Sequence, residues 1–578
     1  MKWLKVALLI GLTGQLHAQK TTVDLIYDDL RTGRIDSVNA MALLASWLEG
    51  APASLQYASG MPVKCGTFVV AQLETFRNQH PEMKKKQRLA SQTFYDHNFL
   101  SKGVLKTFRI NYDSTGANAV PPIDLNLNQV PDWVEETGFA FEHSYRLEVD
   151  TLGYKEPLNF SRAPFYYPIY IEDLNTDYGY TESINQITSN PDTYTTSIFI
   201  ENDYVESNYA THGYDALRVT CAHEFFHAIQ FSYVFRFEDV WYYESSATWM
   251  EDVAYDDVND YYAYLPALFS NPQSTMTSQG IEYAMCVWNH MIEKKYGRQT
   301  IRKSWENMVT MTSLPSINQA ITSTSNSDLA LNYSDFARWN FFTADRADSV
   351  AYYSEGTNYP KVRAAVSTLL RDTVVQSSLG NLASHYFHVW TVDSANCTIN
   401  FTKGVPSSEF SISTVEYNAG TGKRFVQGHG TSTTIQIDGL APGDSLAIIV
   451  SNTKVSTAFG TTGYFLSLVV NENQTTDDVF SDFYMYPSPF RPSTGTLKLK
   501  FRLRKATNLT LDIYSLTGKA IRKLNLGSFV PGNYDGLNMP NLTWDGKTQD
   551  GRASASGVYF YVLKGDGFKK TGKLALVR

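Results

Sequence analysis

The first hundred residues of the chain follow the spacing of α-helices. Across residues 19–105, Asp36 and Thr67 are suited to cap two helices, and Gly50 and Pro81 to end them. We therefore predict a helical N-terminal segment, with the place and size of a propeptide.

Period-two alternation, which is typical of β-strands, follows this segment. It predicts strands at residues 106–116, 165–174 and 193–203. A long stretch with helical spacing then runs from about residue 213 to residue 345. Together these elements predict an α+β domain at residues 106–345.

The last third of the chain is predicted to be all β. Short apolar runs separated by Gly and Asn fill residues 380–472 and favour a β-sandwich, which we place with its linker at residues 346–472. A polar linker at residues 473–483 leads to a last domain at residues 484–578. There the stretch KLKLKFRLRK alternates apolar and basic residues, as a strand with one solvated face does.

The first residues, MKWLKVALLIGLTGQLHAQK, have the pattern of an export signal. Lys2 and Lys5 precede an apolar run, and Ala18 ends a plausible cleavage site. A buried helix or a membrane anchor is the alternative, but the run is too short to span a bilayer, and no later run reaches about 18 apolar residues. We expect residues 1–18 to be removed and the protein to be secreted or held at the outer cell surface.

Length and charge limit the remaining choices. A chain of 578 residues predicts three or four domains, and its net charge of −9 argues against nucleic acid as a partner. Residues 484–578 are the exception, with 16 Lys and Arg against 5 Asp and Glu. An anionic surface as partner and solvated strand faces explain this asymmetry equally well.

The stretch CAHEFFHAIQ is the clearest candidate for a catalytic motif in the chain. His223 and His227 stand four residues apart, so on a helix both imidazoles leave the same face. Glu224 then lies beside the pair, where it can take a proton from a metal-bound water. The spacing predicts a hydrolytic zinc site, with two core histidines as the alternative.

Catalytic zinc needs a third protein ligand. In metzincins this is a histidine six residues after the second one, following a glycine, but Tyr233 and Gln230 occupy those positions here. The next helix instead offers Glu244, which we assign as the ligand, with Glu251 as the partner of an imidazole N–H. The rival carboxylates are Glu238, Asp239, Glu251 and Asp252.

A further donor is expected for the oxyanion of the transition state. Tyr283, at the start of the helical stretch YAMCVWNHMIEKKYG, is our candidate, and His290 is its rival. A plain core aromatic is the alternative for Tyr283.

HEFFHAIQ followed by WYYESSATWMED resembles the gluzincin branch of zinc metallopeptidases. It is similar to a group of secreted bacterial metalloproteases that share this core, over residues 106–345. The resemblance implies a zincin-like fold, a sheet whose edge strand binds substrate through its backbone, and hydrolysis of peptide bonds in a protein or peptide substrate by a monomer. An adhesin with a structural zincin domain and a zinc hydrolase of non-peptide substrates are the alternatives.

The stretch DLNLNQVPDWVE matches the order of oxygen ligands in a calcium loop. It departs from that pattern at Gln129, where glycine is usual, and at Pro131. A polar turn before a helix is the alternative to a Ca²⁺ site. The calcium ligands would be Asp124, Asn126, Asn128, the Val130 carbonyl, Asp132 and Glu135.

The four cysteines are too few for a disulfide scaffold. Cys65 precedes a glycine in the N-terminal segment and resembles the cysteine switch of some zymogens, in which a thiolate occupies the open zinc position. A disulfide or an inert buried thiol is the alternative.

Residues 484–578 resemble the Ig-like C-terminal domain of flagellar-hook-cap-like modules and type IX secretion sorting domains. The resemblance is carried by YPSPFRP, by a turn at Trp544–Gly546 and by a last hairpin that opens at Gly557. It implies that secretion machinery is a partner and that the domain has no catalytic role.

Overall fold

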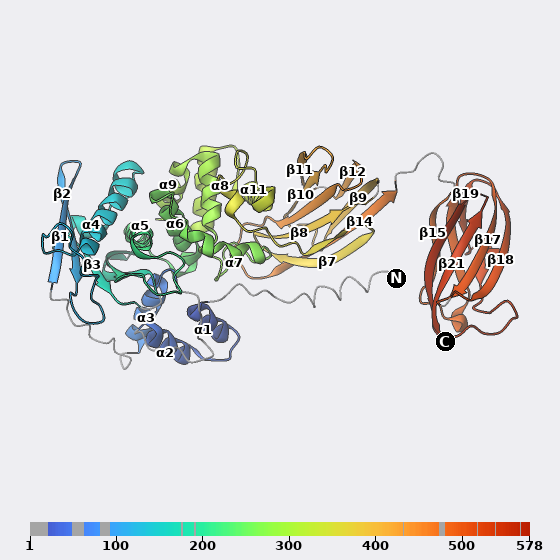
Figure 1. The fold of residues 1–578 in the computed structure, drawn as a ribbon, viewed down its shortest axis with the longest axis horizontal. Helices are drawn as coiled ribbons and strands as arrows, with labels where there is room; N and C mark the ends of the chain where they lie inside the picture. Colours follow the sequence, from blue (N-terminus) through green and yellow to red (C-terminus); the bar gives the residue numbers. More distant parts are fainter. Residues whose placement is uncertain are drawn as a thin grey trace.

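The protein is described here by a computed structural model (Figure 1). It describes residues 21–48, 63–80, 93–472 and 480–578, apart from residues 175–176, 190–191, 393, 432, 517, 538 and 567. The predicted export signal, Gly50 and Pro81 lie outside the described residues.

The N-terminal segment contains three helices with a small apolar core of their own. Asp36 caps the second helix as predicted, since its Oδ1 accepts a hydrogen bond from the Asn39 amide (2.8 Å). The predicted cap at Thr67 is wrong. Thr67 is the first residue of the third helix, after Gly66, and its hydroxyl donates to Glu224 and not to the helix. The helices are α1 (Thr22–Arg31), α2 (Ser37–Leu48) and α3 (Thr67–Gln79).

A five-stranded mixed sheet follows, in the order β1-β2-β3-β5-β4. Its first strand corrects the predicted helical boundary at residue 105, because the side chains alternate between buried and exposed from His97 to Ser101. This alternation lets β1 pair with β2 as a hairpin. The strands are β1 (Thr93–Ser101), β2 (Val104–Tyr112), β3 (Tyr167–Glu172), β4 (Gly179–Ser189) and β5 (Asp192–Glu201).

One edge of this sheet is formed by β4, which the sequence pattern did not predict. Its stretch GYTESINQITS carries mostly polar side chains and therefore gives a weak strand signal. The predicted strand at residues 193–203 is β5, and it lies inside the sheet, parallel to β3 and antiparallel to β4.

Helices cover the sheet and confirm the predicted helical stretch. The central helix α5 packs on β4 and β5 and is flanked by α4 and α6. It begins at Gly213, with His212 at the N-cap position and Asp215 in its first turn. Among the helices of the described residues, none is both long and apolar enough to cross a membrane. The helices are α4 (Asp132–Tyr145), α5 (Gly213–Tyr233), α6 (Val240–Ala254), α7 (Leu265–Ser270), α8 (Cys286–Tyr296), α9 (Arg298–Asn307), α10 (Ser313–Thr324) and α11 (Leu329–Phe341).

Two sheets that face each other across an apolar core make up the predicted sandwich. One has the order β11-β10-β13-β8-β6 and the other β12-β9-β14-β7. The strands are β6 (Val366–Leu369), β7 (Thr373–Gly380), β8 (Ala383–Trp390), β9 (Ala395–Lys403), β10 (Phe410–Tyr417), β11 (Arg424–Gly430), β12 (Thr434–Leu440), β13 (Ser445–Asn452) and β14 (Thr461–Glu472).

The C-terminal part forms two further sheets around a third core, in which Trp544 is buried. The hairpin predicted to open at Gly557 is present as β21 and β22. The strands are β15 (Phe480–Tyr486), β16 (Leu497–Leu503), β17 (Thr507–Ser515), β18 (Ala520–Phe529), β19 (Gly532–Asp535), β20 (Thr543–Trp544), β21 (Gly557–Gly565) and β22 (Phe568–Leu576).

Candidate metal centre

The two motif histidines face each other in the interior of the protein. Both leave the same face of α5 one turn apart, and their Nε2 atoms lie 3.1 Å from each other. His223 and His227 are almost fully buried. Helical spacing therefore brings two imidazoles to one point that water does not surround.

The other ring nitrogen of each histidine has its own hydrogen-bond acceptor. Nδ1 of His223 donates to Oε1 of Glu251 (2.7 Å), as the sequence predicted for Glu251. Nδ1 of His227 donates to Oε1 of Gln230 (2.7 Å), whose amide nitrogen is itself a donor to the Tyr243 carbonyl. These acceptors hold a proton on each Nδ1, so each Nε2 is the ring atom that is available to a metal.

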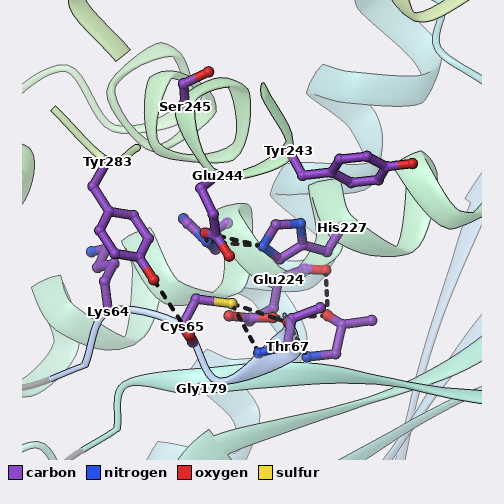
Figure 2. A network of polar contacts seen from close by, with 12 residues as sticks. Lys64, Cys65, Thr67, Gly179, Glu224, His227, Tyr243, Glu244, Ser245 and Tyr283 are labelled. Atoms are coloured by element: carbon purple, nitrogen blue, oxygen red, sulfur yellow. Dashed lines mark hydrogen bonds and ion pairs between the residues drawn. The ribbon is translucent and has the colours of Figure 1, made fainter. Parts of the chain in front are cut away.

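Helix α6 adds a carboxylate to the same point (Figure 2). Oε2 of Glu244 lies 3.2 Å from Nε2 of His223 and 3.6 Å from Nε2 of His227. The rival carboxylates lie elsewhere. Glu238 is exposed, Asp239 accepts a hydrogen bond from the Ser313 amide, and Asp252 is nearest to His290.

The separations of these three ligand atoms suit a tetrahedral zinc ion. Zinc binds histidine nitrogen and carboxylate oxygen at about 2.0–2.2 Å, which places neighbouring ligand atoms roughly 3.3–3.6 Å apart. The pocket also favours positive charge. Burial lowers the pKa of His223, but the carboxylates of Glu244 and Glu251 outweigh burial and raise that pKa to about 10. The residues present therefore fit zinc.

A fourth ligand atom comes from the N-terminal segment. Sγ of Cys65 forms one group with His223, His227 and Glu244, in which all ligand atoms lie within 4.8 Å of one another. All four cysteines of the chain are free and buried, so the alternative of a disulfide at Cys65 is not what the structure contains. Burial and the carboxylates of Glu224 and Glu244 raise the pKa of the Cys65 thiol, so only a neighbouring cation would favour its thiolate.

Cys65 reaches this place because its segment lies along the edge strand β4. The Tyr178 amide donates to the Val63 carbonyl (3.2 Å), and the Gly66 amide donates to the Gly179 carbonyl (2.9 Å). The bridge from Val63 to Asp177 shows that the segment runs parallel to the strand. A Cβ atom at Gly66 would lie 2.3 Å from Oδ2 of Asp177, so a larger residue here would have to displace that buried carboxylate.

Glu224 lies beside the metal ligands with one oxygen engaged and one available. Its Oε2 accepts hydrogen bonds from the hydroxyls of Thr181 (2.8 Å) and Thr67 (3.3 Å). Its Oε1 is buried and has no hydrogen-bond partner among the described residues. Gly179 permits this arrangement, because a Cβ atom there would lie 3.2 Å from the Glu224 side chain.

Tyr283 and His290 have different surroundings. The Tyr283 hydroxyl donates to the Cys65 carbonyl (3.3 Å), and burial raises its pKa well above 10, so it stays a donor. Tyr283 lies in the turn before α8, which begins only at Cys286. The His290 ring lies 5.3 Å from the Tyr261 ring and is tilted against it, and burial lowers the pKa of His290 to about 4. Tyr283 is therefore the one that lies beside Cys65 and His223.

The calcium-like loop is held together by its own polar groups. The side-chain amides of Asn126 and Asn128 donate to the two oxygens of Glu135, each at 2.8 Å. Asp124 accepts from the backbone amides of Asn128 and Gln129. Gln129 has a φ of +70°, the conformation for which calcium loops use glycine. Asp132 accepts from the Leu125 amide. Calcium binding stays a prediction.

Sequence reasoning missed three residues that complete the site. Gln230 served only to exclude the metzincin pattern, and Lys64 was given no role. Thr181 lies on the unpredicted strand β4. Only Gln230 had a signal in the sequence, since it lies three residues after His227 on the same helix.

One family of sequences matches part of the chain. It is described as a family of unknown function, DUF6055, and it matches residues 142–363. This range includes His223, Glu224, His227 and Glu244 but leaves out Cys65. No curated protein matches the chain.

The chain is also similar to several solved structures, all at low identity. PorZ, a surface component of the type-IX secretion system of Porphyromonas gingivalis, is 19% identical over 20% of this chain and 14% of its own, with a TM-score of 0.14. Latent PorU from the same organism is 15% identical over 37% and 19%, with a TM-score of 0.16. A β-galacturonidase from Eisenbergiella tayi is 10% identical over 35% of both chains, with a TM-score of 0.17.

The geometry predicts an order of effects on metal affinity. Glu244→Ala removes a ligand and should weaken zinc binding most. Glu251→Ala and Gln230→Leu each leave an imidazole N–H without its acceptor and should weaken it about 10- to 100-fold. Competition with a chromogenic chelator on the folded variants measures this. Glu238→Ala, in the exposed turn, is the control, and a larger loss from Glu251→Ala than from Glu244→Ala contradicts the ligand assignment.

Proposed function

We propose that the protein is a secreted zinc-dependent endopeptidase of the gluzincin type. One observation carries the proposal: three buried ligand atoms converge beside a glutamate that keeps a free oxygen. His223, His227 and Glu244 would hold the zinc in a zincin-like domain. A sheet edge that can pair with a backbone, a general base and a metal at one point are what hydrolysis of an extended peptide requires.

In this mechanism the chain's own residues handle the proton and the substrate. Zinc, when bound, would polarise the scissile carbonyl and lower the pKa of the attacking water. Glu224 takes the proton of that water and passes it to the leaving amine. Thr181 holds one oxygen of Glu224, so the other is directed to the water. Tyr283 donates to the carbonyl oxygen as it becomes negative.

The same proposal includes latency. Cys65 completes the ligand set, Thr67 occupies an oxygen of Glu224, and Phe68 packs edge-on against the His227 ring. A site with four protein ligands has no position for water. The N-terminal segment would therefore act as a propeptide that keeps the enzyme inactive until it is removed.

The same closed ligand set favours a second candidate function. If the N-terminal segment is never removed, a Cys-His-His-Glu zinc site is structural. The protein would then be a surface adhesin whose β domains bind the ligand. A zinc hydrolase of non-peptide substrates would use the same residues as the peptidase, and the choice between them depends on the substrates that are cleaved.

The remaining features fit an exported protein. The N-terminal export signal and the resemblance of residues 484–578 to type IX sorting domains support delivery to the outer surface or the medium. Ca²⁺ at the loop of residues 124–135 would add rigidity near α4.

Replacing the base should separate metal binding from catalysis. Activity is measured on the activated chain. This is the full-length protein in which a specific protease site replaces Lys84–Lys86. It is cut at that site and separated from its N-terminal fragment. Glu224→Gln should keep one zinc per chain and lose hydrolysis of casein by about 10²- to 10⁴-fold. Metal analysis and the casein assay test this, with Glu238→Gln as the control. Full activity of Glu224→Gln would refute the mechanism.

Removing the thiol should weaken latency. In the uncut chain, Cys65→Ser replaces a strong zinc ligand by a weak one and should raise casein hydrolysis about tenfold or more. The activity should stay below that of the activated chain, because Lys64 and Phe68 still hold the segment. Cys397→Ser, in the sandwich core, should leave the uncut chain inert. If Cys65→Ser is as inert as the unchanged protein, the thiol has no part in latency.

A further inference from the structure

Lys64, next to Cys65, is a buried cation beside the candidate metal site. Its side chain is 1% exposed, and its Nζ forms ion pairs with Glu251 (2.8 Å) and with Asp260. The ammonium also lies over the ring of Tyr178, 4.6 Å from the centroid, and near that of Tyr264. Carboxylates and aromatic faces together form a pocket shaped for one positive charge.

The walls of this pocket belong to the part of the chain that carries the metal site. Tyr178 immediately precedes β4, Glu251 comes from α6, and Asp260 begins the short helix η4 (Asp260–Ala263). Only Lys64 comes from the N-terminal segment. Removal of that segment would therefore leave the pocket in place but without its cation.

The pocket also adjoins the position where peptide bonds would be cut. One oxygen of Glu251 pairs with Lys64, and the other accepts from Nδ1 of His223, a proposed metal ligand. Cys65, the residue after Lys64, places its sulfur among the metal ligands, and its carbonyl meets Tyr283 (Figure 2). A side chain in this pocket therefore belongs to a residue directly beside the one at the metal.

Charge decides what such a side chain must be. Asp260 is fully enclosed, and besides Lys64 it accepts a hydrogen bond from the Tyr178 hydroxyl (3.0 Å). Burial raises the pKa of Asp260, but Lys64 outweighs burial and holds that pKa below its usual value. A buried carboxylate without a counter-charge is strongly unfavourable. An apolar side chain in this pocket would leave both acids unpaired and is therefore disfavoured.

We propose that the pocket lined by Tyr178, Glu251, Asp260 and Tyr264 is a specificity pocket that selects substrates with a lysine or arginine directly beside the scissile bond. This inference rests on the proposed peptidase function. Lys64 occupies the pocket in the latent chain in the way that the basic side chain of a substrate occupies it after activation.

The first test compares matched peptides on the activated chain. Two peptides that differ only in Lys or Met beside a single cleavable bond should differ in kcat/KM by about tenfold or more, in favour of Lys. Asp260→Asn should bring this ratio close to one. Asp257→Asn, an exposed neighbour without contact to Lys64, should leave it unchanged. Cleavage without preference for basic residues overturns the proposal while leaving the peptidase function intact.

The second test does not depend on hydrolysis or on metal. Fluorescence anisotropy measures binding to the activated chain of the labelled peptides VKSGT and VMSGT, in which Ser replaces the cysteine. The lysine peptide should bind about tenfold or more tightly. If no peptide is hydrolysed but this difference is present, the peptidase function fails and the cation pocket stands. Equal affinity, or no binding of either peptide, overturns the pocket.

Discussion

The structure depends on one electrostatic constraint in the cleft. Two imidazole nitrogens and a carboxylate oxygen lie 3.1–3.6 Å apart in a pocket closed to water. Such an arrangement needs positive charge among the three atoms, supplied either by a proton on His223, whose pKa the neighbouring carboxylates raise to about 10, or by a metal cation. The partners behind them, Glu251 and Gln230, keep the ring protons on the far side and so maintain that demand. Helices α5 and α6 provide the rigid frame on which it is built.

Three consecutive residues of the N-terminal segment each make a different contact with the candidate site. Lys64 supplies a positive charge to two buried acids, Cys65 adds the fourth atom of the candidate ligand group, and Gly66 allows the backbone to reach the edge strand. The helices behind it have their own small core, so they can hold these residues in place without being part of the sheet. This segment pairs with the buried acids, places a ligand atom at the candidate metal site and binds the edge strand through its backbone. It is therefore suited to inhibit the site by occupying the place of a substrate.

Spacing on one helix was enough to predict His223, Glu224 and His227, because four residues make about one turn whatever the rest of the fold does. Glu244 and Glu251 followed from the next helix, seven residues apart on one face. The strand β4 was not predicted because an edge strand needs few apolar side chains. The strand β1 was assigned to the helical segment before it. Lys64 and Asp260 lie almost 200 residues apart in sequence, and only the folded chain brings them together.

The central claim is that zinc in the latent protein is held by His223, His227, Glu244 and Cys65. Zinc K-edge absorption of the full-length, uncut chain tests it directly. The account predicts one sulfur at about 2.3 Å and three nitrogen or oxygen ligands at about 2.0–2.2 Å, with the sulfur lost when the N-terminal fragment is removed. A first shell without sulfur in the uncut chain, or a folded chain that binds no zinc, would contradict it.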